Sequence, residues 1–174
     1  MVWRGLCKTG MLGSIPRAGL IKTFNFLENL FQTMRELSPK QKGDISELRS
    51  FAKLTELGYN IYTPVGEDTR SDCIVESENS LFRIQIKTAR YVGESKIRFS
   101  CSSSRSNFTE TSKEPYGDDI DSFIVFHPDK ENFYHVPAED APNTSMYLRV
   151  KPPKSAQRKN INMAEQYKLT ENTF

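Results

Sequence analysis

Four polar residues have the types and the spacing of a hydrolytic metal site: Glu47, Asp72, Gln85 and Lys87. Asp72 and Glu47 offer anionic oxygens and Gln85 offers a neutral amide oxygen, which are the donors that a hard divalent cation prefers. Lys87 adds a group able to orient a water molecule or to neutralise a phosphate. The set predicts phosphodiester hydrolysis assisted by Mg²⁺, with Mn²⁺ as the alternative ion.

Two strands must position three of these side chains. Residues 81–88 alternate between apolar and polar side chains, which predicts a strand on which Gln85 and Lys87 project from the same face. Residues 72–76 predict a second strand, and a short turn between the two favours an antiparallel hairpin. We expect this pairing to place Asp72 beside Gln85 and Lys87.

A helix must supply Glu47. Asp44 is the expected N-cap, Glu47 follows at capping-box spacing, and Gly58 is the expected C-terminal stop after an apolar band. We expect the first turn of this helix to bring Glu47 to the strand ends.

The remaining pattern predicts an α/β domain. The near-continuous apolar run at 120–127 is typical of a strand buried on both faces. Further expected elements are a strand at 59–63, a strand at 96–101 that continues the sheet, a polar loop or helix start at 100–106, a strand at 132–136 and a short helix at 163–169. We expect residues 38–174 to form this domain.

Residues 1–37 form an extension whose role is open. The segment is basic and rich in glycine, with a helical pattern from Ile21 onward. An organelle-targeting peptide within residues 1–30, a DNA-tracking arm and a plain extension ahead of an internal start at Met34 are the three alternatives.

Composition excludes several classes of protein. The net charge of +2 excludes a uniformly polybasic binder, although segments 1–37, 38–144 and 145–174 carry +3, −5 and +4. Three cysteines far apart and two histidines leave no material for a disulfide framework or a zinc site, and free thiols suit a cytoplasmic location. No apolar run approaches the roughly 18 residues of a membrane span.

The order of the four polar residues resembles the PD-(D/E)xK nuclease superfamily: an acid on a helix, a lone Asp, then a strand reading Gln85-Ile86-Lys87. Gln in the place of the usual Glu is most similar to the group I intron-associated homing endonuclease branch, as are residues 116–126 and 134–137. The resemblance covers roughly residues 43–169. It implies a restriction-endonuclease-like α/β core, a mixed central sheet flanked by helices, Mg²⁺, cleavage of double-stranded DNA and a homo-oligomer, either a dimer or a tetramer.

Basic residues after the motif strand and near the C-terminus are candidates for gripping DNA phosphates. They are Arg90, Lys96, Arg98, Ser103, Arg105, Lys151, Lys154, Arg158 and Lys159. An ordinary charged surface is the alternative for all of them.

Each motif residue also has a purely structural interpretation. Glu47 has the spacing of a helix cap, Asp72 that of a turn residue, and Gln85 and Lys87 that of the solvent face of an edge strand. At the level of function, three alternatives stay open beside a site-specific endonuclease. They are a four-way-junction resolvase, a DNA-binding module whose metal site was lost with Gln85, and an interaction protein without affinity for nucleic acid.

Overall fold

The computed structural model describes residues 37–66, 68–78, 80–106, 111–153 and 161–174. Residues 1–36, with the expected helix from Ile21 and the targeting alternative, lie outside the described residues. So do three of the candidate DNA-binding residues, Lys154, Arg158 and Lys159. Within the described part of the chain no helix is long and apolar enough to cross a membrane.

Helix α2 (Pro39–Glu56) begins earlier than its sequence pattern predicts. Ser38 is the N-cap and forms a capping box with Gln41, while Pro39 occupies the first turn, where its missing N–H costs nothing. The predicted N-cap at Asp44 is therefore wrong. Gly58, with a φ of +89°, follows the helix end as predicted, because a glycine adopts that backbone conformation without strain.

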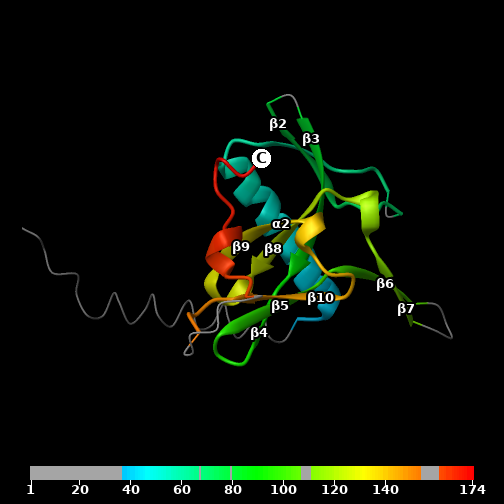
Figure 1. Ribbon diagram of the computed structural model, residues 1–174. Coiled ribbons are helices and arrows are strands. Elements are labelled where there is room, and N and C mark those ends of the chain that lie inside the picture. The colour runs from blue at the N-terminus through cyan, green and yellow to red at the C-terminus, as the bar shows by residue number, and fades with distance from the viewer. Residues whose placement is uncertain (1–36, 67, 79, 107–110, 154–160) are drawn as a thin grey trace, which may run out of the picture. The chain divides into compact units, whose positions relative to one another are not determined.

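The central sheet has five strands in the order β1-β2-β3-β8-β9 (Figure 1). Only β3 and β8 run parallel, and the other neighbours are antiparallel, so the sheet is mixed. The α/β fold class is confirmed, as is the β2–β3 hairpin. The bounds are β1 (Asn60–Tyr62), β2 (Cys73–Ser77), β3 (Ser80–Thr88), β8 (Ser122–His127) and β9 (Asn132–Pro137).

Two smaller sheets follow β3 in the chain. One has the order β10-β5-β4, with β4 (Arg90–Val92), β5 (Lys96–Ser100) and β10 (Ser145–Arg149). The other is the hairpin of β6 (Ser102–Ser106) and β7 (Thr111–Pro115), which stands out from the rest of the domain in Figure 1. Two predictions were wrong here, because β5 leaves the central sheet and the serine-rich segment is a strand.

Among the described residues, three short 3₁₀ helices link successive strands and a fourth follows β10. They are η1 (Gly117–Asp119), η2 (Pro128–Lys130), η3 (Ala138–Asp140) and η4 (Ala164–Tyr167). The last of them lies where a short C-terminal helix was predicted.

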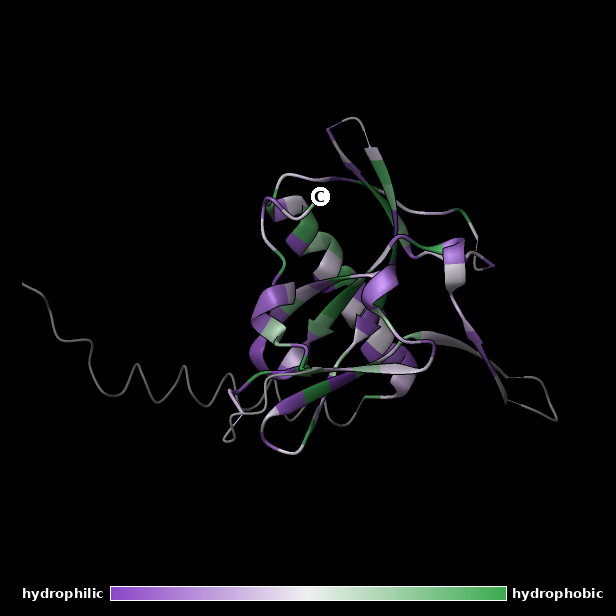
Figure 2. Ribbon diagram, viewed as in Figure 1, coloured by the Kyte–Doolittle hydropathy of each residue, from purple (hydrophilic) through white to green (hydrophobic). Residues whose placement is uncertain are grey.

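Two hydrophobic cores cover opposite faces of the central sheet. On one face Leu54 of α2 packs with Ile84 and Ile86 of β3 and with Ile124 of β8. On the other face strands β5 and β10 pack against β8 and β9 through Ile97, Phe99, Phe123, Val125, Val136, Met146 and Leu148. Every residue of β8 is buried, as the apolar run predicts, and Figure 2 shows hydrophobic residues along β8 and hydrophilic colours along the β6–β7 hairpin.

A polar contact fixes where α2 meets the sheet. The Ser46 hydroxyl lies 2.5 Å from the Thr88 hydroxyl at the end of β3 and donates to the Lys42 carbonyl at 2.8 Å. Glu47 is the next residue on α2. The contact therefore holds this part of the helix against the end of the strand that carries Gln85 and Lys87.

Two leucines of α2 provide a matched test of this packing. Leu54 is 0% exposed and Leu48 is 67% exposed. We predict that Leu54→Ala lowers the free energy of unfolding by about 2–5 kcal/mol, because it leaves a cavity in the core. Leu48→Ala should cost less than about 1 kcal/mol. Urea denaturation measures both, and equal losses would contradict the described placement of α2.

Candidate active site

Asp72 occupies the point where the central sheet opens. Strand β2 begins at Cys73, which pairs with Ile84, so β3 continues past Gln85 with no described strand on that side. The Asp72 side chain bonds there instead: its Oδ2 accepts the Ile86 N–H at 2.6 Å and the Gln85 Nε2–H at 2.5 Å. The Asp72 N–H donates to the Ile84 carbonyl at 2.8 Å. The carboxylate thus caps the free edge of β3 and fixes Gln85.

Lys87 projects from the same face of β3 as Gln85, as the strand alternation predicts. Its Nζ donates to the hydroxyl of Tyr116 at 2.6 Å and lies 4.8 Å from the centre of that ring. Burial lowers the pKa of Lys87, while the charges of Asp72, Cys101 and Glu47 act in the opposite direction. The amine is therefore held in place, half-buried, and easier to deprotonate than an exposed lysine.

Glu47 lies in the interior of α2 rather than in its first turn, so the helix-cap interpretation is wrong. Burial raises the pKa of Glu47, and the neighbouring charge of Asp72 raises it further. Lys87 lowers it in turn. These mutual effects show that Glu47, Asp72 and Lys87 interact electrostatically. Glu47 takes part from α2, the helix that covers the opposite face of the sheet from Lys87.

The pKa of Asp72 is also raised, by burial above all. The Ile86 N–H, the charge of Lys87 and the Gln85 amide all lower it and so offset part of that effect. Two carboxylates that share a half-buried site resist losing both protons. A cation bound between them would relieve this repulsion.

The solvent-face interpretation of Gln85 and Lys87 is wrong. Although this end of β3 has no described strand on the side of Asp72, Gln85 is only 8% exposed and Lys87 is half-buried. A buried amide needs partners, and the Gln85 NH₂ group finds one in Asp72. Its amide oxygen is a neutral acceptor.

Tyr116 and Arg70 belong to the surroundings of the site, and sequence reasoning missed both. The Arg70 guanidinium lies 4.8 Å from the Tyr116 ring centre and donates to Asp119 at 3.0 Å, to Ser103 at 2.9 Å and to the Pro115 carbonyl. Burial raises the pKa of Tyr116 to about 12, so its hydroxyl stays neutral. No local pattern indicates these roles, because Tyr116 comes 29 residues after Lys87 and Arg70 lies in a loop.

The donor set fits a hard cation held mostly by oxygen. No group of three or more His, Cys, Asp or Glu side chains gathers as metal ligands within the described residues. Any ion would therefore rely on the two carboxylates and the Gln85 amide oxygen, together with water and substrate oxygens. Such sparse protein ligation is typical of Mg²⁺, which keeps several waters.

The candidate DNA-binding residues fall in three places. Arg90, Lys96 and Arg98 lie on β4 and β5, with Arg90 directly opposite Arg98. Ser103 accepts a hydrogen bond from Arg70, and Arg105 lies on β6, with its side chain outside the described part. Lys151 follows β10 and is exposed. Among the described candidates, Ser103 is connected to the site through Arg70, whose guanidinium lies over the Tyr116 ring, whereas the others are not gathered with the Asp72 group.

Comparisons with known proteins give one family model and a structural match of similar fold. The sequence profile described as PD-(D/E)XK endonuclease matches residues 37–170. Among solved structures, a bacterial homing endonuclease, I-Ssp6803I, superimposes with a TM-score of 0.62 at 21% sequence identity, covering 76% of this chain and 89% of that chain. No curated protein matches the sequence.

The raised pKa of Asp72 predicts how its ionisation affects stability. A carboxyl group with a folded pKa above its ordinary value of 3.8 is harder to ionise when folded, so the free energy of unfolding falls as the pH rises through that window. We predict that Asp72→Asn, measured by urea denaturation in EDTA, flattens this fall. Exposed Asp118→Asn is the control, and an Asp72→Asn profile parallel to wild type would contradict the prediction.

Proposed function

The chain belongs to the PD-(D/E)XK endonuclease family, and on that premise we propose that it is a Mg²⁺-dependent, site-specific endonuclease that hydrolyses phosphodiester bonds of double-stranded DNA. The observation that carries the proposal is the Asp72 carboxylate, bonded to Gln85 and to the Ile86 N–H, with Glu47 and Lys87 in its field. The similarity to the structure of a homing endonuclease supports site-specific cleavage.

Asp72, Glu47 and the Gln85 amide oxygen are the proposed ligands of the divalent ion. When bound, the ion supplies positive charge that stabilises the developing negative charge on the phosphate. Because Gln85 stands where a carboxylate is usual, the site carries one negative charge fewer. We expect weaker binding of the ion than a third carboxylate would give.

Lys87 is the proposed partner of the attacking water. The water oxygen forms a bond to phosphorus as the bond to the leaving oxygen breaks, and the water must give up a proton. Because burial lowers the pKa of Lys87, its nitrogen is better suited to orient that water and accept the proton than an exposed lysine would be. Tyr116 keeps the amine in one position through the 2.6 Å hydrogen bond to its hydroxyl.

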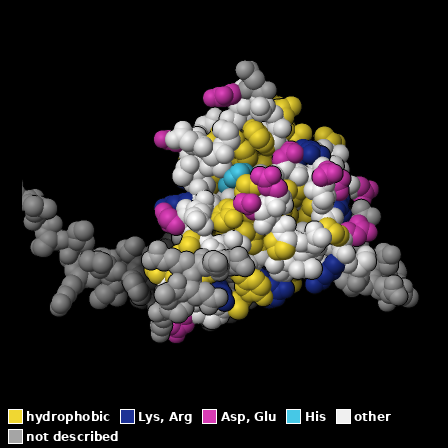
Figure 3. Space-filling model, in the orientation of Figure 1, with side chains coloured by type: hydrophobic (Ala, Val, Ile, Leu, Met, Phe, Trp, Pro, Cys, Tyr) yellow, Lys and Arg dark blue, Asp and Glu magenta, His cyan; other side chains and the backbone are white. Residues whose placement is uncertain are grey.

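The outer face of the β10-β5-β4 sheet is a proposed contact for the DNA backbone. Register places Tyr147, Arg98 and Arg90 in one row across the three strands. Arg149, Lys96 and Val92 form the next row. No strand residue on this face is acidic, although Glu94 lies in the β4–β5 turn. Figure 3 shows Lys and Arg side chains along the lower edge of the molecule, where Figure 1 places these strands.

Assembly and location also remain proposals. A single small domain covers a short stretch of duplex, so we propose that two or four copies combine to recognise a long site. Cys73 and Cys101 are buried free thiols, which supports the proposed cytoplasmic location.

Loss of the site should abolish cleavage without unfolding the protein. We predict that Asp72→Asn and Lys87→Ala each lower the cleavage rate at least about 10²-fold, the scale of a lost acid–base group. The assay is cleavage of a plasmid library with randomised inserts in Mg²⁺, and in Mn²⁺ in parallel, with EDTA abolishing it. Exposed Lys40→Ala is the control for Lys87→Ala, and circular dichroism checks folding.

Other results of that assay point to the alternatives. Full activity in Asp72→Asn or Lys87→Ala would contradict the assigned site. A wild-type chain that binds duplex but cuts nothing in either ion would indicate an inactive DNA-binding module. Preferential cutting of four-way junctions in competition with linear duplex would indicate a resolvase.

The basic sheet face predicts a particular salt dependence. Replacing Arg90, Lys96 and Arg98 together by alanine should weaken duplex binding and lower the slope of log K against log salt by up to about 0.9 per lost phosphate contact. Fluorescence anisotropy in EDTA measures both quantities. The control is a triple alanine variant of Lys40, Arg49 and Lys53 on α2, which removes the same charge. Equal changes in affinity and slope in the two variants would contradict the proposal that this sheet face contacts DNA.

A further inference from the structure

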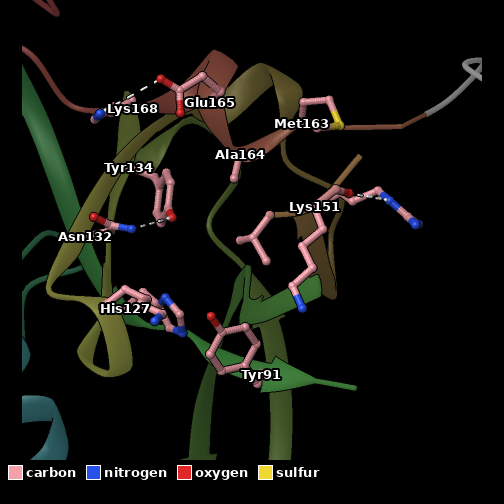
Figure 4. Close-up of a pocket in the computed structure, with 12 residues that line it drawn as sticks. Tyr91, His127, Asn132, Tyr134, Lys151, Met163, Ala164, Glu165 and Lys168 are labelled. Carbon is pink, nitrogen blue, oxygen red and sulfur yellow. Dashed lines mark hydrogen bonds and ion pairs between the residues drawn. The ribbon is translucent and has the colours of Figure 1, made fainter. Parts of the chain in front are cut away.

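A pocket lies outside the Asp72 group. It has a volume of about 320 Å³ and opens between Tyr91 of β4, the ends of β8 and β10, the start of β9, and η4. None of the residues that line it belongs to the proposed catalytic set. Figure 4 shows aromatic, amide and lysine side chains converging on it from these separate elements.

His127 is the unusual residue of this pocket. Its ring is fully buried, yet neither Nδ1 nor Nε2 has a hydrogen-bond partner among the described residues. The nearest carboxylate oxygen, of Asp129, is 3.8 Å from Nε2, beyond hydrogen-bond length. Burial lowers the pKa of His127, so the ring is a neutral imidazole with one donor and one acceptor unused. Buried polar groups are normally satisfied, so this ring marks the pocket wall as unusual and is a sensitive reporter of a ligand bound beside it.

The groups around His127 are hydrogen-bond donors. The Tyr91 ring stands edge-on to the imidazole at 4.5 Å, and the described residues offer its hydroxyl no partner. The Tyr134 hydroxyl accepts from Asn132 at 3.4 Å, which leaves its own hydrogen free to donate. The pocket therefore presents several donors, and few acceptors to meet them.

The charge of the pocket is positive. Four of its lining residues are basic: Lys130, Arg149, Lys151 and Lys168. Its one lining carboxylate, Glu165, pairs with Lys168 at 3.9 Å. Within the described residues no carboxylate pairs with Lys151, whose side chain extends toward the Tyr91 ring in Figure 4. A donor-rich, positive pocket matches an anion with several acceptor oxygens.

We propose that this pocket binds the phosphate group of a phosphate ester, either a free nucleotide or the backbone of a DNA strand. Lys151 supplies the charge, and the Tyr91 and Tyr134 hydroxyls supply hydrogen bonds to the phosphate oxygens, while His127 lies buried in the wall behind them. A volume near the lower end of the range of ligand pockets, about 300–1,000 Å³, suits one nucleotide or a single phosphate group at the surface of a DNA strand. Arg149 lies both beside the pocket and in the basic row of the sheet face, so the pocket adjoins the proposed DNA contact.

Calorimetric titration of the full chain in EDTA tests the proposal with thymidine 5′-monophosphate as the probe. We expect saturable binding of the monophosphate, none of thymidine, and a shift of the His127 ring signals in ¹⁵N–¹H spectra on binding. Lys151→Ala should weaken binding at least about tenfold, the scale of one charge-assisted hydrogen bond, while Lys40→Ala leaves it unchanged. Absence of binding, or equal binding by Lys151→Ala and wild type, would overturn the proposal.

Two further experiments complete the test. The first distinguishes a free nucleotide from the DNA backbone as the source of the phosphate, and the second distinguishes this pocket from the Asp72 group as the binding site. Displacement of the bound monophosphate by a short duplex identifies the DNA backbone as the source, whereas retention of the monophosphate identifies a free nucleotide. Asp72→Asn should bind the monophosphate as wild type does, because the pocket does not use that carboxylate. Loss of binding in Asp72→Asn with its fold intact would place the probe in the Asp72 group and overturn the second site.

Discussion

The Asp72 carboxylate makes the hydrogen bond to β3 that a longer strand β2 would make, and the rest of the site depends on this bond. Because β2 begins only at Cys73, the Ile86 N–H would otherwise be left without a partner at the open end of the hairpin. The same oxygen that accepts this N–H also accepts the Gln85 amide. One carboxylate thus caps the free edge of β3 and orients the Gln85 side chain, at the point where β2 no longer pairs with β3.

Keeping three ionisable side chains partly buried at this free edge of β3 costs free energy, which indicates a functional role. Glu47, Asp72 and Lys87 are all partly shielded from water, and burial shifts the pKa of each toward its neutral form. Charged groups are rarely kept in such surroundings for stability alone, since an apolar replacement of the same shape is often as stable. Shifts of this kind, in a cluster held by hydrogen bonds, are characteristic of functional sites.

Much of this arrangement can be predicted from the sequence, because it depends on local periodicity. The alternation of 81–88 predicted the shared face of Gln85 and Lys87, and the apolar run at 120–127 predicted the buried central strand β8. The start of α2 was missed because Asp44 and Glu47 imitate a capping box within a helix that Ser38 caps. Three features depend on residues far apart in the chain and could not be predicted from local periodicity. They are the hydrogen bond between Lys87 and the Tyr116 hydroxyl, the position of Arg70 at the base of the β6–β7 hairpin, and the pairing of β5 outside the central sheet.

The central claim is that Glu47, Asp72 and Gln85 hold a divalent ion beside Lys87. Paramagnetic broadening of backbone amide signals by Mn²⁺, in a ¹⁵N–¹H spectrum of the full chain, tests it most directly. We predict that the signals of Glu47, Ile86 and Lys87 broaden first, that excess Mg²⁺ restores them, and that Asp72→Asn abolishes the effect. Uniform broadening, or selective broadening centred on another part of the domain, would contradict the claim.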